Sequence, residues 1–319
     1  MITFVHLINS GESYFKNMDT MNRRNFLKTT AVTAVASTVL PGNVLTAAPA
    51  DSKQAAKKKI GLQLYSLRED MAKNADATLE AVAKIGYSFI ETYGYADGKF
   101  FGKTPKEFST QLSGLGLKMT SSHTGFGVYT NDTTEAWDAV KKNMADTREA
   151  GSKWIVQAGY PGARYTELAQ VEKLADTFNR IGELAKQHGL KFAYHNHREE
   201  FRAISNQIPY QRYIELTDAA LVAFQMDIGH VANEMADYRA YLKLYPGRFG
   251  CLHIRDTDVK TKIAIEMGRG HVALEDVYNL FVNAGVEDYY VEQEEYNYEP
   301  LESIKMCYDY LAAAAFVKW

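Results

Sequence analysis

Short apolar runs alternate along the chain with longer stretches in which apolar residues recur at spacings of three and four. The short runs predict eight strands, which begin at Ile60, Ser88, Leu117, Lys153, Leu190, Leu221, Phe249 and Asp288. The longer stretches predict helices, and several of them close with glycine before the next strand, at Gly86, Gly116, Gly151, Gly189 and Gly285. This alternation predicts an α/β fold, the (β/α)8 TIM barrel, over residues 60–319. A doubly wound open sheet is the alternative, but no G-x-G-x-x-G fingerprint follows the first strand.

The amino-terminal residues 1–59 lack this pattern and carry a different signal. Paired Arg23 and Arg24 precede a Phe-Leu-Lys triplet, a mildly apolar stretch to Leu40, and a run of small residues. The segment resembles a twin-arginine export signal, and its apolar stretch is shorter than the roughly 20 residues that span a bilayer. A basic surface helix is the alternative. We expect an upstream extension, then a cleaved signal peptide, then a flexible lead-in, and the resemblance implies a periplasmic protein.

Composition narrows the function classes. The formal net charge is −3 and the pI is about 6.3, so the sequence predicts no nucleic-acid partner. No stretch after the leader is apolar for long enough to insert stably in a membrane. Cys251 and Cys307 are too few for a disulfide framework, and we expect both in the core. The expected partner is a small molecule, and the sequence gives no indication of the oligomeric state.

Polar side chains collect where the predicted strands end. They are His123, His195, His197, Asp227, His230, His253, Arg255, Glu292 and Glu294. Residues two apart on a strand share a face, so the apolar neighbours point outward and these side chains point into the mouth of the barrel. Active residues of TIM barrels lie at this end. Gln63, Tyr65 and Glu91 also stand near strand ends, where they either line the mouth or pack.

Carboxylates and imidazoles that converge in this way suit one divalent ion such as Mn²⁺, Co²⁺, Zn²⁺ or Mg²⁺. The alternative is a polar mouth held together without metal, for example by ion pairs of Asp227 with His253 or Arg255. A metal ion would acidify a C–H beside a carbonyl, and neighbouring carboxylates would transfer the proton.

Several motifs resemble the sugar phosphate isomerase/epimerase superfamily of xylose isomerase-like barrels, which includes endonuclease IV, ketohexose 3-epimerases and inosose dehydratase. They are "GLQLYSLR", "YHNHREEF", "DIGH", "HIRD", "GRGHV" and "VEQEE". The resemblance implies Asp227, His253 and Glu292 as metal ligands and His230 as a substrate-contacting or second-metal histidine.

One departure concerns the fifth strand, where many relatives have Glu-Asn-His and this chain has His195, Asn196 and His197. We expect Glu200, in the following loop, to replace the missing ligand, with Glu199 as a further possibility. His195 and His197 then contact substrate or support the ligands, and the alternative makes His195 the ligand.

The resemblance implies a metal-dependent sugar isomerase or epimerase. We expect Glu292 to transfer the proton, with Glu200 or His195 as the second catalytic group. The expected substrate-binding residues are His123, His197, His230 and Arg255. The leading alternative is a 3-keto-glycoside lyase or dehydratase that uses the same site for β-elimination, and an endonuclease IV-like hydrolase or a non-catalytic sugar-binding barrel is less favoured.

Export favours an unphosphorylated sugar or an oxidised glycoside as substrate. The segment "GRGHV", Gly268 to Val272, is the motif that would suit phosphate, because it precedes a predicted helix. It is equally well explained as a structural turn between strand and helix.

Overall fold

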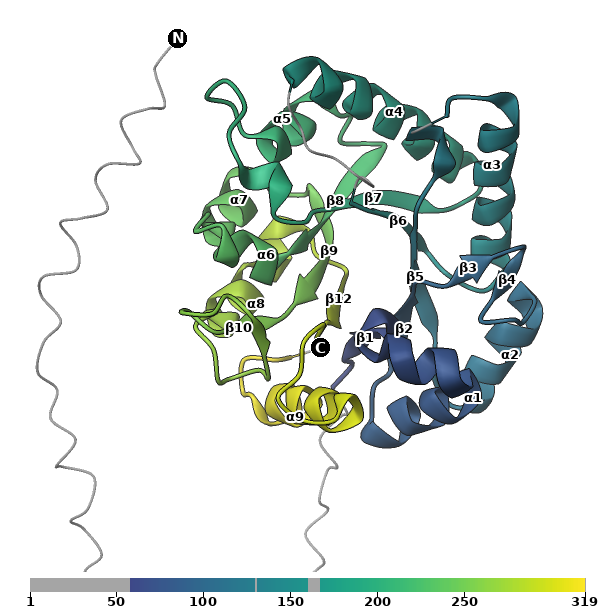
Figure 1. The fold of residues 1–319 in the computed structure, drawn as a ribbon, viewed down its shortest axis with the longest axis vertical. Coiled ribbons are helices and arrows are strands. Elements are labelled where there is room, and N and C mark those ends of the chain that lie inside the picture. The colour runs from purple at the N-terminus through teal and green to yellow at the C-terminus, as the bar shows by residue number, and fades with distance from the viewer. Residues whose placement is uncertain (1–57, 130, 160–166, 319) are drawn as a thin grey trace, which may run out of the picture. The chain divides into compact units, whose positions relative to one another are not determined.

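The computed structural model describes residues 58–129, 131–159 and 167–318. Eight parallel strands close into a barrel in the order β1-β12-β9-β8-β7-β6-β5-β2 (Figure 1). They are β1 (Gly61–Gln63), β2 (Phe89–Thr92), β5 (Met119–Thr124), β6 (Trp154–Ala158), β7 (Lys191–His195), β8 (Val222–Asp227), β9 (Phe249–Ile254) and β12 (Asp288–Val291). The predicted TIM barrel is confirmed, and each strand coincides with a predicted run. The expected signal peptide, including Arg23 and Arg24, lies outside the described residues.

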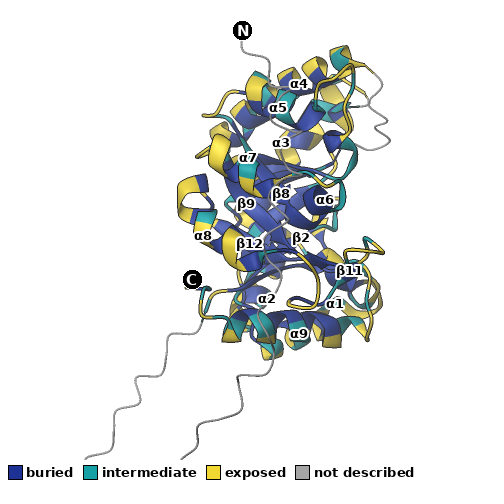
Figure 2. Cartoon of the chain, turned by 90° about the vertical axis from the view of Figure 1, so that its left-hand side faces the viewer, coloured by how far each residue is buried: buried dark blue, intermediate teal, exposed yellow. Residues whose placement is uncertain are grey.

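Helices surround the barrel and expose their outer sides, while the strands are buried (Figure 2). They are α1 (Arg68–Ile85), α2 (Pro105–Gly114), α3 (Thr134–Glu149), α4 (Leu168–Gln187), α5 (Pro209–Leu216), α6 (Ile228–Asn233), α7 (Tyr238–Leu244), α8 (Leu274–Ala284) and α9 (Pro300–Ala313). Shorter elements are η3 (Leu64–Leu67), η4 (Gly127–Tyr129), η5 (Glu199–Phe201) and two hairpins, β3 (Tyr95–Ala96) with β4 (Lys99–Phe100) and β10 (Asp256–Thr257) with β11 (Ala264–Ile265). Within the described ranges, no helix is long and apolar enough to cross a membrane.

Local sequence signals account for where these helices begin and end. The Thr104 side chain accepts a hydrogen bond from the Glu107 backbone while the Glu107 carboxylate accepts one from the Thr104 backbone, and Pro105 occupies the first turn of α2. The five glycines expected at helix ends all have positive φ, between 69° and 124°. These signals fix the boundaries between helices and strands. The boundaries determine which side chains lie at the carboxyl end of each strand.

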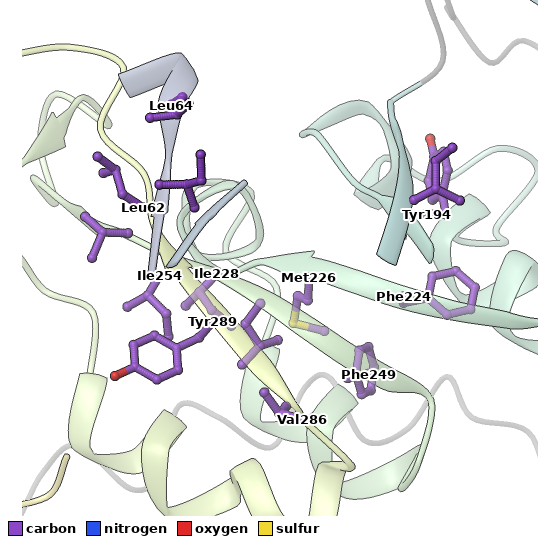
Figure 3. Close-up of a cluster of buried hydrophobic side chains, with 14 of the residues drawn as sticks. Leu62, Leu64, Tyr194, Phe224, Met226, Ile228, Phe249, Ile254, Val286 and Tyr289 are labelled. Carbon is purple, nitrogen blue, oxygen red and sulfur yellow. The ribbon is translucent and has the colours of Figure 1, made fainter. Parts of the chain in front are cut away.

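Strand alternation divides the buried side chains into two cores. Outward-facing residues such as Tyr194, Phe224, Met226 and Ile254 pack beneath the helices (Figure 3). The inward-facing apolar set is separate and comprises Phe89, Trp154, Val156, Ala193, Cys251 and Tyr290. Both cysteines are buried and free, as expected.

The inward-facing set lies nearer the amino-terminal ends of the strands than the polar side chains that follow it, because Phe89, Cys251 and Tyr290 stand two positions before Glu91, His253 and Glu292. Gly250 is required there, because a Cβ atom at this position would lie 2.1 Å from the Trp154 ring. The packed rings close this end of the barrel, so the space for a ligand lies at the carboxyl ends of the strands.

Candidate active site

A cavity of about 300 Å³ opens at the carboxyl ends of the barrel strands. Its lining includes Tyr65 and Tyr93 beyond β1 and β2, and the charged or titratable side chains of His123, His195, His197, Glu292 and Glu294. The structure therefore brings together side chains from five separate strand ends, as strand alternation predicts.

Four buried residues beside this cavity form a candidate metal-binding group, namely His195, Asp227, His253 and Glu292. One ligand atom from each lies within 4.8 Å of those of the other three, a spacing compatible with metal–ligand bonds of roughly 2.0 to 2.3 Å. Two imidazole nitrogens and two carboxylate oxygens suit the divalent ions named above. The residues present therefore fit a divalent metal ion.

Arg255 ties the carboxylates of this group together. Its Nη2 contacts Glu292 Oε2 and lies 2.6 Å from Asp227 Oδ2, and its Nη1 lies 2.7 Å from Glu294 Oε2. The contact with Asp227 is an ion pair without hydrogen-bond geometry, so Oδ2 of Asp227 is buried with no hydrogen-bond partner among the described residues. A buried carboxylate oxygen without a hydrogen bond is available to a metal ion.

The charges in this group perturb one another strongly. Burial opposes the charge on Glu292, but His253 and Arg255 outweigh it and hold the pKa of Glu292 well below its usual range. Burial likewise opposes the charge on His253, and the carboxylates of Glu292 and Glu91 outweigh it and raise the pKa of His253 to about 10. For Asp227 burial dominates and raises the pKa, although Arg255 opposes it.

His195 differs electrostatically from the other members. Burial, followed by the neighbouring His253, lowers its pKa well below the usual value, so the imidazole is neutral. A neutral imidazole is the form that coordinates a metal ion.

Glu200 is not brought into the group. Its Oε1 accepts a hydrogen bond of 2.5 Å from the Tyr194 hydroxyl, and its Oε2 accepts one of 3.1 Å from the His197 backbone. Tyr194 lies on the outward face of β7, stacked 4.6 Å from Phe178 of α4. The Glu200 carboxylate is therefore held on the helix side of the barrel wall, and burial raises its pKa. Glu199 is partly exposed and lies 3.8 Å from Arg202.

Of the expected substrate-contacting histidines, His123 and His197 line the cavity, and His230 lies behind His197 and is not among the lining residues. His123 stacks on His253 with ring centroids 4.9 Å apart, and its Nε2 lies 2.5 Å from Gln225 Oε1. The His197 and His230 rings are 5.3 Å apart. The His230 backbone donates to Asp227 Oδ1 at the start of α6, which positions Asp227 at its strand end.

Glu91 lies at the centre of the site, although the sequence pattern marks it only weakly. It is fully buried on β2, and its carboxylate contacts His253 at 2.5 Å and His123 at 3.2 Å. Alternation from Phe89, which points into the barrel, would have placed Glu91 on the inner face. Its closeness to residues of β9 depends on closure of the barrel.

The "GRGHV" segment is a structural turn. The backbone N–H groups of Gly268, Gly270 and Val272 donate to the Asp256 carboxylate at 3.0, 2.8 and 3.0 Å. Asp256 thus occupies the amides that a phosphate group would need. The nearby His271 donates from Nδ1 to the Thr257 carbonyl, and it is not part of the metal-binding group.

Comparison with known proteins agrees with this geometry. The family described as xylose isomerase-like TIM barrel matches residues 79–309. The chain belongs to this family. A second model, for the twin-arginine translocation signal sequence, matches residues 20–39 and supports export of the barrel.

Two relatives of the barrel cover most of the chain. An inosose dehydratase of Mesomycoplasma hyopneumoniae is 24% identical over 280 residues, which are 76% of this chain and 89% of the relative. A crystal structure of a sugar phosphate isomerase/epimerase from Parabacteroides distasonis is 28% identical, with a TM-score of 0.75, and covers 84% of this chain and 98% of its own. The IolI protein with a bound zinc atom, at 14% identity and a TM-score of 0.62 over 81% of this chain and 98% of its own, shows the shared fold alone.

Proposed function

We propose that this member of the xylose isomerase-like family is a divalent-metal-dependent enzyme that removes a proton beside the carbonyl of a sugar. The observation that carries the proposal is the convergence of four buried ligand atoms within 4.8 Å, next to a cavity at the carboxyl end of the barrel. Isomerisation or epimerisation is the favoured outcome of that proton transfer.

The proposed ligands are His195, Asp227, His253 and Glu292. His195 replaces Glu200, the ligand expected first, because the His195 imidazole lies in the group while Glu200 is held by Tyr194. A bound divalent ion would supply positive charge to stabilise the negative charge that develops on a carbonyl oxygen.

Glu292 is the proposed proton-transfer group. Both of its cationic contacts, from His253 Nδ1 and Arg255 Nη2, are made to Oε2. Oε1 therefore remains for a substrate proton, and Glu292 lines the cavity. His197 lines the same cavity from the end of β7 and is the proposed second acid or base.

The expected substrate is an unphosphorylated sugar or an oxidised glycoside. Among the described residues that line the cavity, none is Lys or Arg. Arg255 faces three carboxylates, and Asp256 takes up the amides of the "GRGHV" turn. The signal-sequence match supports a periplasmic location, where such sugars are encountered.

Elimination is the second candidate outcome, because the inosose dehydratase of Mesomycoplasma hyopneumoniae matches over 89% of its own length. Loss of a leaving group β to the carbonyl would follow the same proton abstraction. The chemistry would then be that of a lyase acting on a 3-keto-glycoside or a related cyclic ketone.

The test follows exchange of the α-hydrogen with deuterated water, by NMR, across free sugars and 3-keto-glycosides. Isomerisation or epimerisation gives saturated, deuterated isomers, whereas elimination gives an unsaturated product and a free leaving group. Chelation should abolish exchange, and restoring the ion should recover it. Exchange that persists without metal, or a protein that binds sugars but exchanges none, would refute the proposal.

A matched pair of variants ties the result to the metal-binding group. Asp227 and Asp237 both cap a helix with their side chains, at α6 and α7. Asp227→Ser keeps a capping oxygen but removes the ligating carboxylate and should lose the ion, whereas Asp237→Ser should keep both the ion and the exchange. Equal metal contents in the two variants would remove Asp227 from the ligand set.

A further inference from the structure

We infer that Glu91 and Gln225 are positioning residues that hold a proton on one ring nitrogen of His253 and of His195, so that the other nitrogen of each ring is the one that binds the metal ion. The inference rests on the proposed ligand set and adds two residues that do not themselves belong to it. Some groups in the interior of the barrel can only accept hydrogen bonds, and these groups fix which atoms of their neighbours carry protons.

Glu91 accepts hydrogen bonds from several directions. Gln63 Nε2 and Gln225 Nε2 each lie 2.7 Å from its carboxylate, His253 Nε2 lies at 2.5 Å, and the Ser121 hydroxyl also donates. An ionised carboxylate can only accept, so every atom that faces it must be a donor. The Gln225 atom that faces Glu91 is therefore the amide nitrogen, and the His253 nitrogen carries a proton.

The orientation of Gln225 then determines that of His195. With its nitrogen directed at Glu91, Gln225 turns its carbonyl oxygen toward His195 Nδ1 at 3.0 Å and His123 Nε2 at 2.5 Å. A carbonyl oxygen only accepts, so Nδ1 of His195 carries a proton. Its Nε2 is consequently left with the lone pair that a metal ion requires.

His253 is oriented from its other side. Its Nε2 donates to Glu91, and its Nδ1 lies 2.7 Å from Glu292 Oε2, within the metal-binding group. Because both nitrogens face carboxylates, both carry protons in the metal-free protein, and an ion that binds displaces the Nδ1 proton while Glu91 keeps the proton on Nε2. A single buried carboxylate thus fixes two ligands, one directly and one through Gln225.

Hydrogen-bond partners of the ligating histidines affect the affinity of the site for its metal ion. A hydrogen-bonded carboxylate that orients a metal-ligating histidine contributes about 10- to 100-fold to metal affinity or activity. Glu91→Gln keeps the size of the side chain but introduces an NH2 group. That group must face either Gln225 or His253. If the NH2 group faces Gln225, the Gln225 amide has to turn over, and its nitrogen then faces His195 and reverses the His195 tautomer. If the NH2 group faces His253, the His253 Nε2 proton loses its acceptor.

The experiment compares Glu91→Gln with the exchanged pair Glu91→Gln/Gln225→Glu. In the pair, the carboxylate at position 225 accepts from His195, His123 and the new amide, whose oxygen accepts from His253. We expect the single variant to bind Zn²⁺ about 10- to 100-fold more weakly by calorimetric titration, and the pair to recover most of this loss. Imidazole ¹⁵N shifts should show the His195 proton on Nδ1 in the metal-free wild type and in the pair.

Two further variants separate positioning from folding. Ser121→Ala removes one donor to Glu91 without touching a histidine, and should leave the affinity and the ¹⁵N shifts unchanged. Gln225→Met removes the amide without changing the charge, and should reproduce the weaker binding if Glu91→Gln does not fold. Wild-type affinity and an Nδ1 proton on His195 in Gln225→Met would overturn the inference while the metal site stood. A wild type that binds no Zn²⁺ would instead overturn the proposed function, whatever the ¹⁵N shifts show.

Discussion

His195→Ala and Glu200→Gln decide which residue after the fifth barrel strand holds the metal. The two side chains are five positions apart, yet only His195 lies in the metal-binding group. Glu200 is bonded to Tyr194 and to the His197 backbone. We therefore expect metal loss in the first variant and normal metal binding in the second.

The magnitudes follow from the ligand count and the hydrogen bonds. Four-ligand sites bind Zn²⁺ with roughly 10 to 16 kcal/mol, or about 2.5 to 4 kcal/mol for each ligand when shared equally. Since about 1.4 kcal/mol is a factor of ten, His195→Ala should weaken binding roughly 60- to 700-fold. Glu200→Gln can still accept from the His197 N–H and can donate to the Tyr194 hydroxyl. Its unfolding free energy should fall by no more than about 1 kcal/mol.

The assay is calorimetric titration of the metal-free variants with Zn²⁺, accompanied by thermal unfolding followed by circular dichroism. A stability change of about 1 kcal/mol would move Tm by roughly 2 to 4 °C. Glu200→Gln also tests its own folding. Only a folded variant can bind the ion, and we expect its metal affinity to stay within about threefold of wild type. The reasoning is refuted if Glu200→Gln loses the ion and His195→Ala keeps it.

The remaining predictions concern catalysis, export and pH. Glu292→Gln keeps a ligating oxygen but cannot accept a proton, so α-hydrogen exchange should fall roughly 10²- to 10⁴-fold while much of the metal remains. Changing Arg23 and Arg24 to Lys should leave the precursor in the cytoplasm, measured by cell fractionation. Burial raises the pKa of Glu200, so its ionisation costs stability as the pH rises through that raised value. Unfolding free energies measured against pH should show this loss in wild type and not in Glu200→Gln.

Each of these outcomes has a clear opposite. Exchange at the wild-type rate in Glu292→Gln would place the base elsewhere, with His197 as the next candidate. Normal export of the Arg23→Lys/Arg24→Lys protein would show that the leader does not use the twin-arginine route. An unchanged pH dependence in Glu200→Gln would mean that this carboxyl is solvated and is not held against Tyr194.

The barrel and the general position of its site were determined by sequence alone. Helix and strand periods are local properties, and alternation within a strand fixes which side chains share a face. Asp227, His253 and Glu292 could therefore be placed at one end of the barrel before their contacts were known, and the structure brings them together. The same rule placed Tyr194 on the outer face of the fifth strand.

Tertiary structure decided the partners of these groups. Glu91 meets His253 across 162 positions of sequence, and Gln225 meets His195 across 30, because the closed barrel brings the inner faces of its strands together. The loop that carries Glu200 had no period to orient it, so only packing against Tyr194 showed on which side of the wall its carboxylate lies. Hydrogen bonds between distant segments depend on barrel closure and strand register. A local pattern of apolar and polar residues determines neither of these.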